Sequence, residues 1–498
     1  MPSRIARLIA VYVSSPGVVG PGYRSATLIP PPVCNGIREQ YITYGTAARA
    51  WRLQLTPLPL SAPTTPPQGL PRQIPVPEAG PAPLVARRSG WRRDAIAAVL
   101  WMLAVVPAGM GFWLVAGSVA GVAPSEVPAL VAASLLSLGI GTLLQVVFGF
   151  RLPMYEGPAA AYLAAVTVVI AEGHHSLAAI TGGLLAAGAF VALLGAVGAD
   201  RLMAKAFTPL VANVFVLTVT LAVIPETLER AVGATGEVHD KAAAWTATIV
   251  VVASALGLRR FRRLVPYSLL VALVAGTGVY IALAGVPRVE LGGSFVAPAL
   301  FPWGAPKASA GVVLPFILAG ALAAFNTIAS GKVVSMAHDV PAGRGAQRRS
   351  FVMHGAAQAA GAMFGSLVGT VSRVDSVPIA RLLDHRGQAP LVLCSILVGA
   401  LAFVRPFVRI AAAIPLSVSA ALLAVLLVLI LIHAARGVAR ESRVVVGFVV
   451  LPALIPSVAW IVVGSSLAPT AQLLANPMLW GVLLALVLER VVAARRAQ

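Results

Sequence analysis

The chain has 498 residues, of which 58% are hydrophobic and only 11% are charged, and its mean hydropathy is +0.89. Soluble domains contain about 25% charged residues, and a chain with so little charge cannot cover a water-exposed surface. The composition therefore excludes a soluble enzyme. The net charge of +20 is spread over small basic clusters in the predicted loops. This distribution is typical of a protein in a lipid bilayer and argues against nucleic-acid binding.

Residues 1–90 differ in composition from the rest of the chain. They are basic and rich in proline, and they contain no apolar run long enough to cross a bilayer. Such a segment cannot bury enough surface to offset the entropy lost on ordering, so we predict a disordered leader. The alternative is a mistaken translation start upstream of the true one. Mass spectrometry of the mature N-terminus distinguishes them, because peptides from residues 1–80 would exclude the mistaken start.

Apolar runs recur from Arg92 onward. A bilayer core about 30 Å thick needs about 20 apolar residues per helix, so we predict an all-α polytopic membrane protein with about fourteen spans. The predicted spans are 95–118, 128–150, 153–171, 177–198, 207–224, 243–258, 266–285, 311–332, 352–370, 372–385, 389–404, 411–432, 444–462 and 476–493.

Charged loops predict the orientation of these spans. Loops rich in Lys and Arg alternate with loops that carry Glu126, Glu226 and Glu229. Because cytoplasmic loops carry the excess of basic residues, we predict a multi-pass protein of the plasma membrane with both termini in the cytoplasm. Arg405 and Arg409 are the exception, since this topology places them outside.

The third and tenth predicted spans are interrupted by the residues Glu-Gly-Pro at 156–158 and Asp-Ser-Val-Pro at 375–378. We expect each span to begin as a short extended strand and to continue as a half-helix. Their separation predicts a seven-plus-seven inverted repeat with halves at 91–305 and 306–498. Short, broken segments at matching places in two halves indicate a substrate site near the bilayer midplane.

Two carboxylates fall on these interrupted spans, where ionisable groups are costly and mark function. Asp375 is predicted to bind substrate or a proton. The alternative is that it caps the half-helix and pairs with Arg373. Glu156 takes the corresponding place in the third span, either as a cap favoured by the helix dipole or as a second proton-coupling candidate.

Other polar side chains lie within the predicted spans. Asn326 and Ser330 are four residues apart on one helix face, where they either line the site or bond a neighbouring helix. Tyr162 follows Pro158 on a half-helix and either stacks on a planar substrate or packs in the core. Gln358 is predicted to hydrogen-bond a neighbouring helix.

Several classes of chemistry are absent from the sequence. Two cysteines, Cys34 and Cys394, cannot form a disulfide framework or a zinc site. The sequence also lacks a Walker motif, a His/Cys cluster and a Gly-x-Ser-x-Gly elbow. We therefore predict a protein that is not an enzyme and needs no metal or cofactor.

Three motifs carry a family resemblance: Gly-Ile-Gly-Thr-Leu-Leu-Gln at 139–145, Phe-Thr-Pro-Leu-Val at 207–211 and Ala-Ile-Pro-Leu-Ser-Val at 413–418. They resemble the nucleobase–ascorbate transporters, or xanthine/uracil permeases, over about residues 92–495. The resemblance implies fourteen spans in a seven-plus-seven inverted repeat, with short strands opening spans three and ten. It also implies core and gate domains that alternate access, and a homodimer.

The resemblance also places site residues. The family carboxylate of span ten falls on Asp375, which Ser376 follows in the binding site. The carboxylate of span eight falls on Asn326, and the polar residue one turn later falls on Ser330. The aromatic residue that stacks on the base falls on Tyr162.

This chain departs from the family pattern at Asn326, which removes the acid that the resemblance makes the main proton-binding group. Asp375 or Glu156 then carries the proton, or transport is uncoupled. Replacing Asp375 by Asn is expected to abolish the coupling in the first case.

We predict a secondary active transporter of a small planar solute, a purine or pyrimidine nucleobase, carried with protons by alternating access. The alternative is an anion exchanger or channel resembling the sulfate-permease family, in which Arg373 would bind the anion. Asp375 beside an anion is unfavourable. The solute that competes for uptake, a neutral heterocycle or an inorganic anion, distinguishes the two.

Overall fold

The computed structural model describes the chain from residue 90 to residue 497 with short gaps, and this part is mostly helical. The predicted leader at 1–90 lies outside the described residues except for Gly90. The gaps are 172, 174–175, 200–207, 236–239, 288, 339, 341–342, 344, 384–386 and 464–476.

Local sequence signals explain where several helices of the first half begin. Thr208 caps α7, since its side chain accepts a hydrogen bond from the amide of Val211, and Pro209 occupies the first turn. Asp240 caps α8 through the amide of Ala243. The elements are α2 (Trp91–Val119), α3 (Val127–Val147), β1 (Glu156–Pro158), α4 (Ala160–Ala171), α5 (Leu177–Ala196), α7 (Pro209–Ala231), α8 (Lys241–Gly257), η1 (Leu258–Arg260), η2 (Val265–Tyr267) and α9 (Ser268–Ala284).

The second half departs from the predicted boundaries at its prolines and glycines. The predicted span at 411–432 begins too early: α14 ends at Ala412 and α15 starts at Leu416, because Pro415 disfavours helical geometry in the residue before it. The elements are α10 (Ala310–His338), α11 (Ala346–Met363), β2 (Thr370–Ser372), α12 (Ser376–Leu382), α13 (Ala389–Leu401), α14 (Arg405–Ala412), α15 (Leu416–Val438), α16 (Arg443–Val445), the π-helical turn η3 (Val446–Val450), α17 (Leu451–Val463) and α19 (Pro477–Ala497).

Among the described residues, eight helices are long and apolar enough to cross a membrane by length and composition. In α8 and α9 fewer than a third of the residues in the most apolar window are buried. Their exposed side chains include Trp245, Ile249 and Val274. Large apolar surfaces of this kind are stable in lipid but not in water. The composition and the structure thus agree on a membrane protein.

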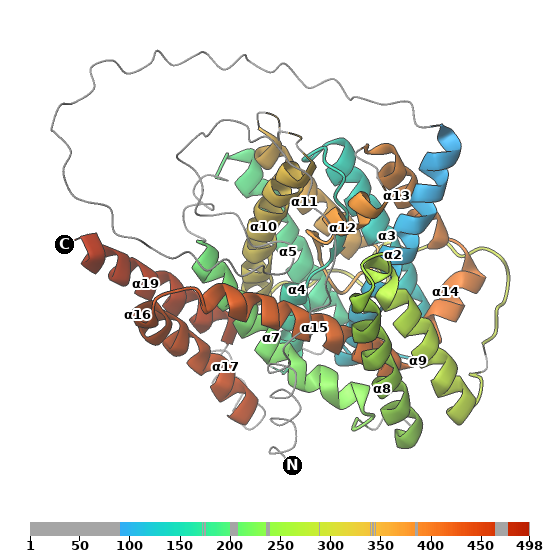
Figure 1. The fold of residues 1–498 in the computed structure, drawn as a ribbon. Coiled ribbons are helices and arrows are strands. Elements are labelled where there is room, and N and C mark those ends of the chain that lie inside the picture. Colours follow the sequence, from blue (N-terminus) through green and yellow to red (C-terminus); the bar gives the residue numbers. More distant parts are fainter. Residues whose placement is uncertain are drawn as a thin grey trace, which may run out of the picture. The chain divides into compact units, whose positions relative to one another are not determined.

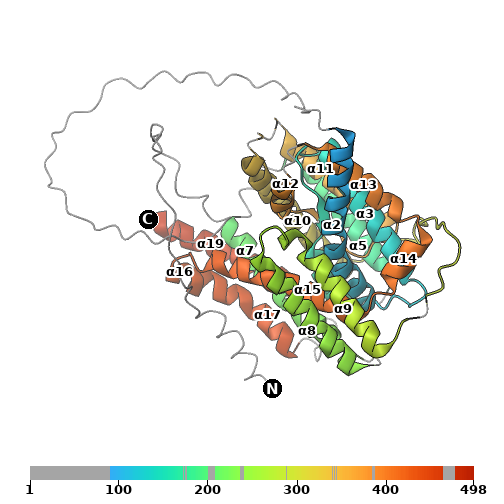
Figure 2. The same ribbon diagram turned by 45° about the vertical axis from the view of Figure 1, so that its right-hand side comes forward.

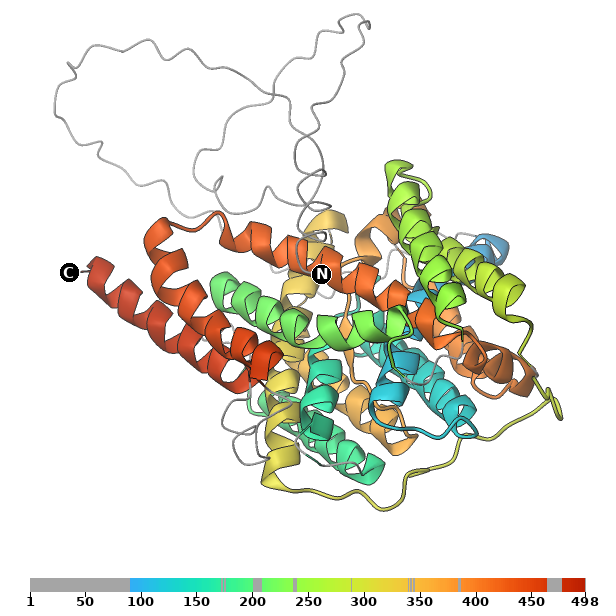
Figure 3. The ribbon, with the colours of Figure 1, turned by 90° about the horizontal axis from the view of Figure 1, so that it is seen from below.

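Most helix contacts fall into two sets, which α2 connects because it packs against both α13 and α15. In the first, α5 packs against α10 and α11, and α3 packs against α11 and α13. In the second, α15 packs against α7 and α8, while α17 and α19 lie side by side next to α7 (Figure 3). Helices α8 and α9 form an adjacent pair (Figure 1 and Figure 2). Because α5 pairs with α11 and α7 with α15, the two halves of the chain interleave.

The two interrupted segments meet as a two-stranded antiparallel sheet. Strand β1 precedes the half-helix α4, and β2 precedes the half-helix α12. The prediction of a strand followed by a half-helix is therefore confirmed at both places. Strand β2 lies at 370–372, where residues 352–370 had been predicted to span as a helix. Helix α11 ends earlier because Gly365 adopts a positive φ of 95°, which ends a helix readily.

The pairing register corrects the predicted match between Glu156 and Asp375. Glu156 pairs with Ser372, Gly157 with Val371 and Pro158 with Thr370. Asp375 lies three residues beyond its strand, at the N-cap position of α12. Glu156 is therefore a strand residue and caps no helix.

The exceptional arginines Arg405 and Arg409 contact the long segment between α9 and α10. The amide of Arg405 donates to the carbonyl of Ser294 at 3.1 Å, and the Arg409 guanidinium donates to the carbonyl of Glu290 at 2.6 Å. Phe295 stacks on Phe403 with ring centroids 5.8 Å apart. The Arg409 side chain thus satisfies a backbone carbonyl of this segment, which gives it a structural reason for its position.

Candidate functional site

The paired strands present two different faces. Successive side chains of a strand point to opposite sides, so Tyr155 and Gly157 share one face and Glu156 the other. A Cβ atom added at Gly157 would lie 3.0 Å from the side chain of Arg373, which places Arg373 on the Tyr155 face. We call these the Asp375 face, with Tyr155, Arg373 and Asp375, and the Glu156 face, with Glu156 and Ser372.

The Asp375 face holds a partly exposed ionic cluster. The Arg373 guanidinium donates to Asp375 Oδ2 at 3.1 Å, and the Tyr155 hydroxyl donates to the same oxygen at 3.1 Å. The Asp375 side chain is 42% exposed, whereas the Arg373 side chain is only 17% exposed. Trp101 of α2 meets the Tyr155 ring edge-on at 6.2 Å. The carboxylate is therefore oriented by two donors and still accessible to a solute.

Asp375 was predicted either to bind substrate or a proton, or to cap the half-helix and pair with Arg373. The predicted ion pair with Arg373 is present. The residue occupies the N-cap position, but its side chain makes no capping hydrogen bond. The following Ser376 is buried, donates to the carbonyl of Arg373 at 2.7 Å and accepts from the amide of Tyr155 at 3.1 Å. Ser376 thus holds the turn that presents Asp375, and its hydroxyl is engaged by backbone.

The Glu156 face is fully buried. The Glu156 carboxylate accepts a hydrogen bond from the Ser372 hydroxyl and lies 3.2 Å from Nδ1 of His354 in α11. The Thr142 hydroxyl accepts the backbone amide of Glu156 at 3.1 Å. The side chains of Glu156 and His354 are both 0% exposed. A carboxylate in such a position needs the partners that surround it, because an unpaired buried charge is strongly unfavourable.

Tyr162 lies in the core and not at an open surface. Its side chain is 0% exposed, and a Cβ atom added at Gly369 would collide with its ring. The hydroxyl has no hydrogen-bond partner among the described residues. The structure therefore leaves no face of this ring open to a substrate, and the stacking role is available only after the segment at Gly369 moves.

The two polar residues of α10 differ in exposure. Asn326 is exposed, while Ser330 one turn later is 2% exposed. Helix α10 packs against β2, so both lie on an element next to the paired strands. The helical spacing predicted that Asn326 and Ser330 share one face of the helix. In the structure, neighbouring elements cover Ser330 but leave Asn326 exposed.

Sequence reasoning missed Tyr155, His354 and Ser372 as site residues. A usable signal existed for His354, which lies inside a predicted span four residues before Gln358 and therefore on the same helix face. Gln358 itself accepts the amide of Thr370 at 3.1 Å, so it bonds strand β2, where a bond to a neighbouring helix was predicted. No local pattern identifies Tyr155 or Ser372, because their roles arise from pairing across the sheet.

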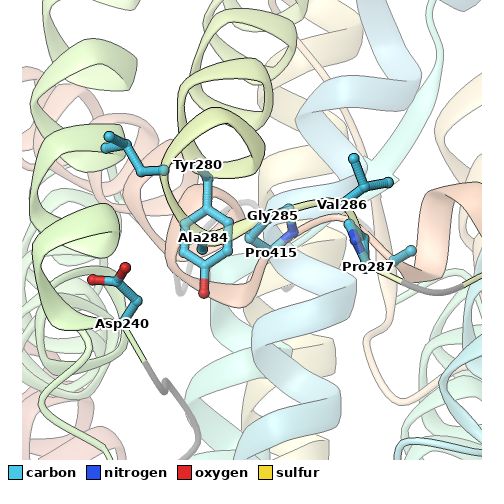
Figure 4. Close-up of a pocket in the computed structure, with 9 residues that line it drawn as sticks. Asp240, Tyr280, Ala284, Gly285, Val286, Pro287 and Pro415 are labelled. Atoms are coloured by element: carbon cyan, nitrogen blue, oxygen red, sulfur yellow. The ribbon is translucent and has the colours of Figure 1, made fainter.

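A separate cavity of about 430 Å³ opens between α8, the end of α9 and the segment before α15. Asp240 and Tyr280 line it together with Pro415, as Figure 4 shows. None of the predicted site residues lines this cavity. Within the described part of the chain, no group of three His, Cys, Asp or Glu side chains is arranged to hold a metal ion.

Comparison with known proteins identifies the family. Residues 95–444 match the model of the xanthine/uracil permeases, described as "Permease family". The chain belongs to this permease family. It is 26% identical to the "Putative purine permease YwdJ" of Bacillus subtilis (strain 168) over 313 residues, covering 58% of this chain and 69% of that protein.

Solved structures show the same fold for this permease family member. The transmembrane domain of a cyanobacterium bicarbonate transporter, BicA, matches with a TM-score of 0.56 at 15% identity, covering 79% of this chain and 97% of that chain. The murine Solute Carrier 26 family member A9 anion transporter, in its inward-facing state, matches with a TM-score of 0.53 at 13% identity, covering 82% and 69%. The family resemblance and the transporter class predicted from the sequence are confirmed.

Proposed function

We propose that this permease carries a purine-type nucleobase across the plasma membrane by alternating access, coupled to protons. The observation that supports it best is the Asp375 face, where a carboxylate oriented by Arg373 and Tyr155 remains accessible. A carboxylate accepts hydrogen bonds from adjacent N–H groups, which the edge of a nucleobase offers. Membership in the permease family and the similarity to the putative purine permease of Bacillus subtilis point to the same substrate class.

In this proposal Asp375 binds the N–H edge of the base and Ser376 holds the loop that presents it. Asn326 offers an amide that both donates and accepts, and Ser330 supports its end of α10. Tyr162 contacts the base if Gly369 moves during the transport cycle. Asp375 and Glu156 are the candidates for the coupled proton.

The proposed architecture is a seven-plus-seven inverted repeat of about fourteen spans with halves at 91–305 and 306–498. The group containing the paired strands would be the moving core, and the group of α7, α8, α9, α15, α17 and α19 the gate. Both termini would be cytoplasmic, and the permease would act as a homodimer. The interleaving of α5 with α11 and of α7 with α15 supports the repeat.

Anion transport is the second candidate, because the solved structures that match are bicarbonate and anion transporters. Arg373 would have to bind the anion. Its guanidinium is engaged by Asp375 at 3.1 Å, so the local charge is already neutralised. An anion would lose the attraction of Arg373 and meet the repulsion of Asp375, which makes a neutral heterocycle the better substrate.

Uptake into proteoliposomes tests the proposal. Radiolabelled uracil, xanthine, adenine and sulfate are offered with and without an inward proton gradient. We expect gradient-driven accumulation of a purine base and none of sulfate. Base uptake that does not depend on the gradient would support the proposed substrate but contradict proton coupling. Uptake of sulfate alone would replace the proposal by the anion function.

Replacing Tyr155 by Phe is expected to raise the half-saturating concentration of the base about fivefold. The variant loses the hydroxyl that orients Asp375, a charge-assisted hydrogen bond worth about 1 kcal/mol at a partly exposed group. Initial uptake rates over a range of base concentrations measure this. Tyr280→Phe, in the cavity of Figure 4, is the matched control and should transport like the wild type. Equal half-saturation for the two variants would contradict the role of Tyr155.

A further inference from the structure

The Glu156 face contains an acid–base pair that joins the two halves of the chain. Glu156 lies on β1 and His354 lies on α11, 198 residues later in the sequence. Their side chains are completely buried, and Glu156 Oε2 lies 3.2 Å from His354 Nδ1. Helix packing alone would be served by neutral or apolar groups, since buried ionisable pairs are costly to desolvate. A titratable pair at this depth indicates a function that needs a proton.

The charges around the paired strands do not balance without a proton. On the Asp375 face, the charges of Arg373 and Asp375 cancel each other. On the Glu156 face, an ionised Glu156 beside a neutral His354 leaves one negative charge in excess. Moving a buried net charge relative to the membrane is unfavourable, whereas a neutral pair moves at lower cost. One added proton removes the excess.

Polar groups from three neighbouring elements lie around this pair. Strand β2 contributes the Ser372 hydroxyl, which donates to the Glu156 carboxylate, α3 contributes the Thr142 hydroxyl, which accepts the Glu156 amide, and α4 contributes the buried Tyr162. Among the described residues no other charged side chain is paired with Glu156. His354 Nε2 has no hydrogen-bond partner among the described residues either, so the second ring nitrogen is available to a water molecule or a proton.

We propose that Glu156 and His354 together carry the coupled proton. This assignment rests on the proposed function of proton-driven base transport. The pair takes up one proton from the outer side, shared between Glu156 Oε2 and His354 Nδ1, and changes from one negative charge to none. The neutral core then moves with the base bound at Asp375. The proton leaves on the inner side and the pair regains its negative charge. Glu156 directly follows Tyr155 in the chain, and Ser372 directly precedes Arg373. The paired strands therefore connect the proton-binding pair to the residues that orient Asp375.

The test compares gradient-driven accumulation with base exchange in the absence of a gradient. An inward gradient of about one pH unit drives about tenfold accumulation if one proton accompanies each base. In Glu156→Gln and in His354→Gln we expect accumulation to fall to a ratio of about one while exchange persists. We also expect exchange by these variants to lose the pH dependence seen in the wild type. If the pair only stabilised the fold, the substitutions would lower accumulation and exchange together.

Ser350→Ala is the matched control. Ser350 in α11 bonds Gln145 in α3 at 2.9 Å, one turn from His354, and neither side chain titrates. This variant should keep its accumulation ratio even if it is less stable.

Accumulation near tenfold in either Glu156→Gln or His354→Gln would overturn the proposal while leaving base transport intact. If one of the two variants does not fold, the other decides. A wild-type permease that exchanges no base would instead contradict the proposed function, and the proton assignment would fall with it.

Discussion

Asp375→Asn is expected to lower the uptake of the base by about 100-fold. The amide would lose the charge that binds Arg373 and Tyr155 and would offer one acceptor where the carboxylate offers two. A charge-assisted hydrogen bond is worth about 1.5–3 kcal/mol, and a loss of about 2.7 kcal/mol is a factor of about 100. Initial uptake rates, normalised to the amount of permease in the membrane, measure the effect.

Asp240→Asn is the matched control for this substitution. Asp240 also lies at a helix N-terminus, where its carboxylate accepts the amide of Ala243 at 2.9 Å, but it lines the separate cavity of Figure 4. Asn is an equally good cap, so uptake should stay within about twofold of the wild type. If Asp375→Asn also stayed within this range, the carboxylate would have no part in binding.

Gly355→Ala is expected to destabilise the permease by about 3 kcal/mol or to prevent folding. A Cβ atom at Gly355 would overlap the carbonyl oxygen of Gly188 and lie 2.5 Å from the amide nitrogen of Ala192. Both obstacles are backbone of α5, which cannot turn aside as a flexible side chain can. The helices would have to separate, and forced overpacking of a core costs about 1–3 kcal/mol even where side chains can adjust. The thermal unfolding midpoint of the purified protein in detergent measures the loss.

Gly278→Ala supplies the comparison. Gly278 is also a helical glycine, in α9, but a Cβ atom there meets nothing within 4 Å. Alanine is a better helix former than glycine by about 1 kcal/mol, so this variant should be as stable as the wild type or slightly more stable. An unfolding midpoint for Gly355→Ala equal to that of Gly278→Ala would show that α5 and α11 separate at little cost.

The small residues of α5 and α11 explain why this interface is so close. Gly188 and Gly355 face each other backbone to backbone, and Gly195 likewise meets the backbone of Val352. Helices in a bilayer gain little from burying apolar side chains against each other, so their association depends on contacts that small residues permit. The close approach of these two helices also fixes the position of His354, which lies next to Gly355 in α11.

The sequence alone was sufficient for the class of the protein and for most of its elements. Long apolar runs separated by charged loops predict spanning helices because the bilayer leaves no other partner for the backbone. The interruptions at 156–158 and 375–378 were visible because proline and the charged residues cannot continue an apolar helix. These are local effects, which depend on neighbouring residues in the chain.

Tertiary structure decided which of the polar residues meet. The ion pair of Arg373 with Asp375 joins near neighbours and was predictable, but Tyr155 reaches Asp375 across 220 positions and His354 reaches Glu156 across 198. The expected correspondence between Glu156 and Asp375 was wrong because strand register depends on how the two half-helices dock. Register also decides which face each side chain takes, since a shift of one residue reverses every side chain of a strand.

The burial of Tyr162 and the exposure of Asn326 likewise depend on tertiary structure and not on local sequence. Their positions on a half-helix and a full helix followed from local sequence, whereas the packing of Gly369 against Tyr162 and the exposure of Asn326 did not. Apolar length and backbone breaks are properties of consecutive residues, so they were enough to predict a polytopic permease with two broken segments. Only the tertiary structure separated the accessible Asp375 face from the buried Glu156 face, because that separation arises where two distant strands pair and alternate side chains point to opposite sides.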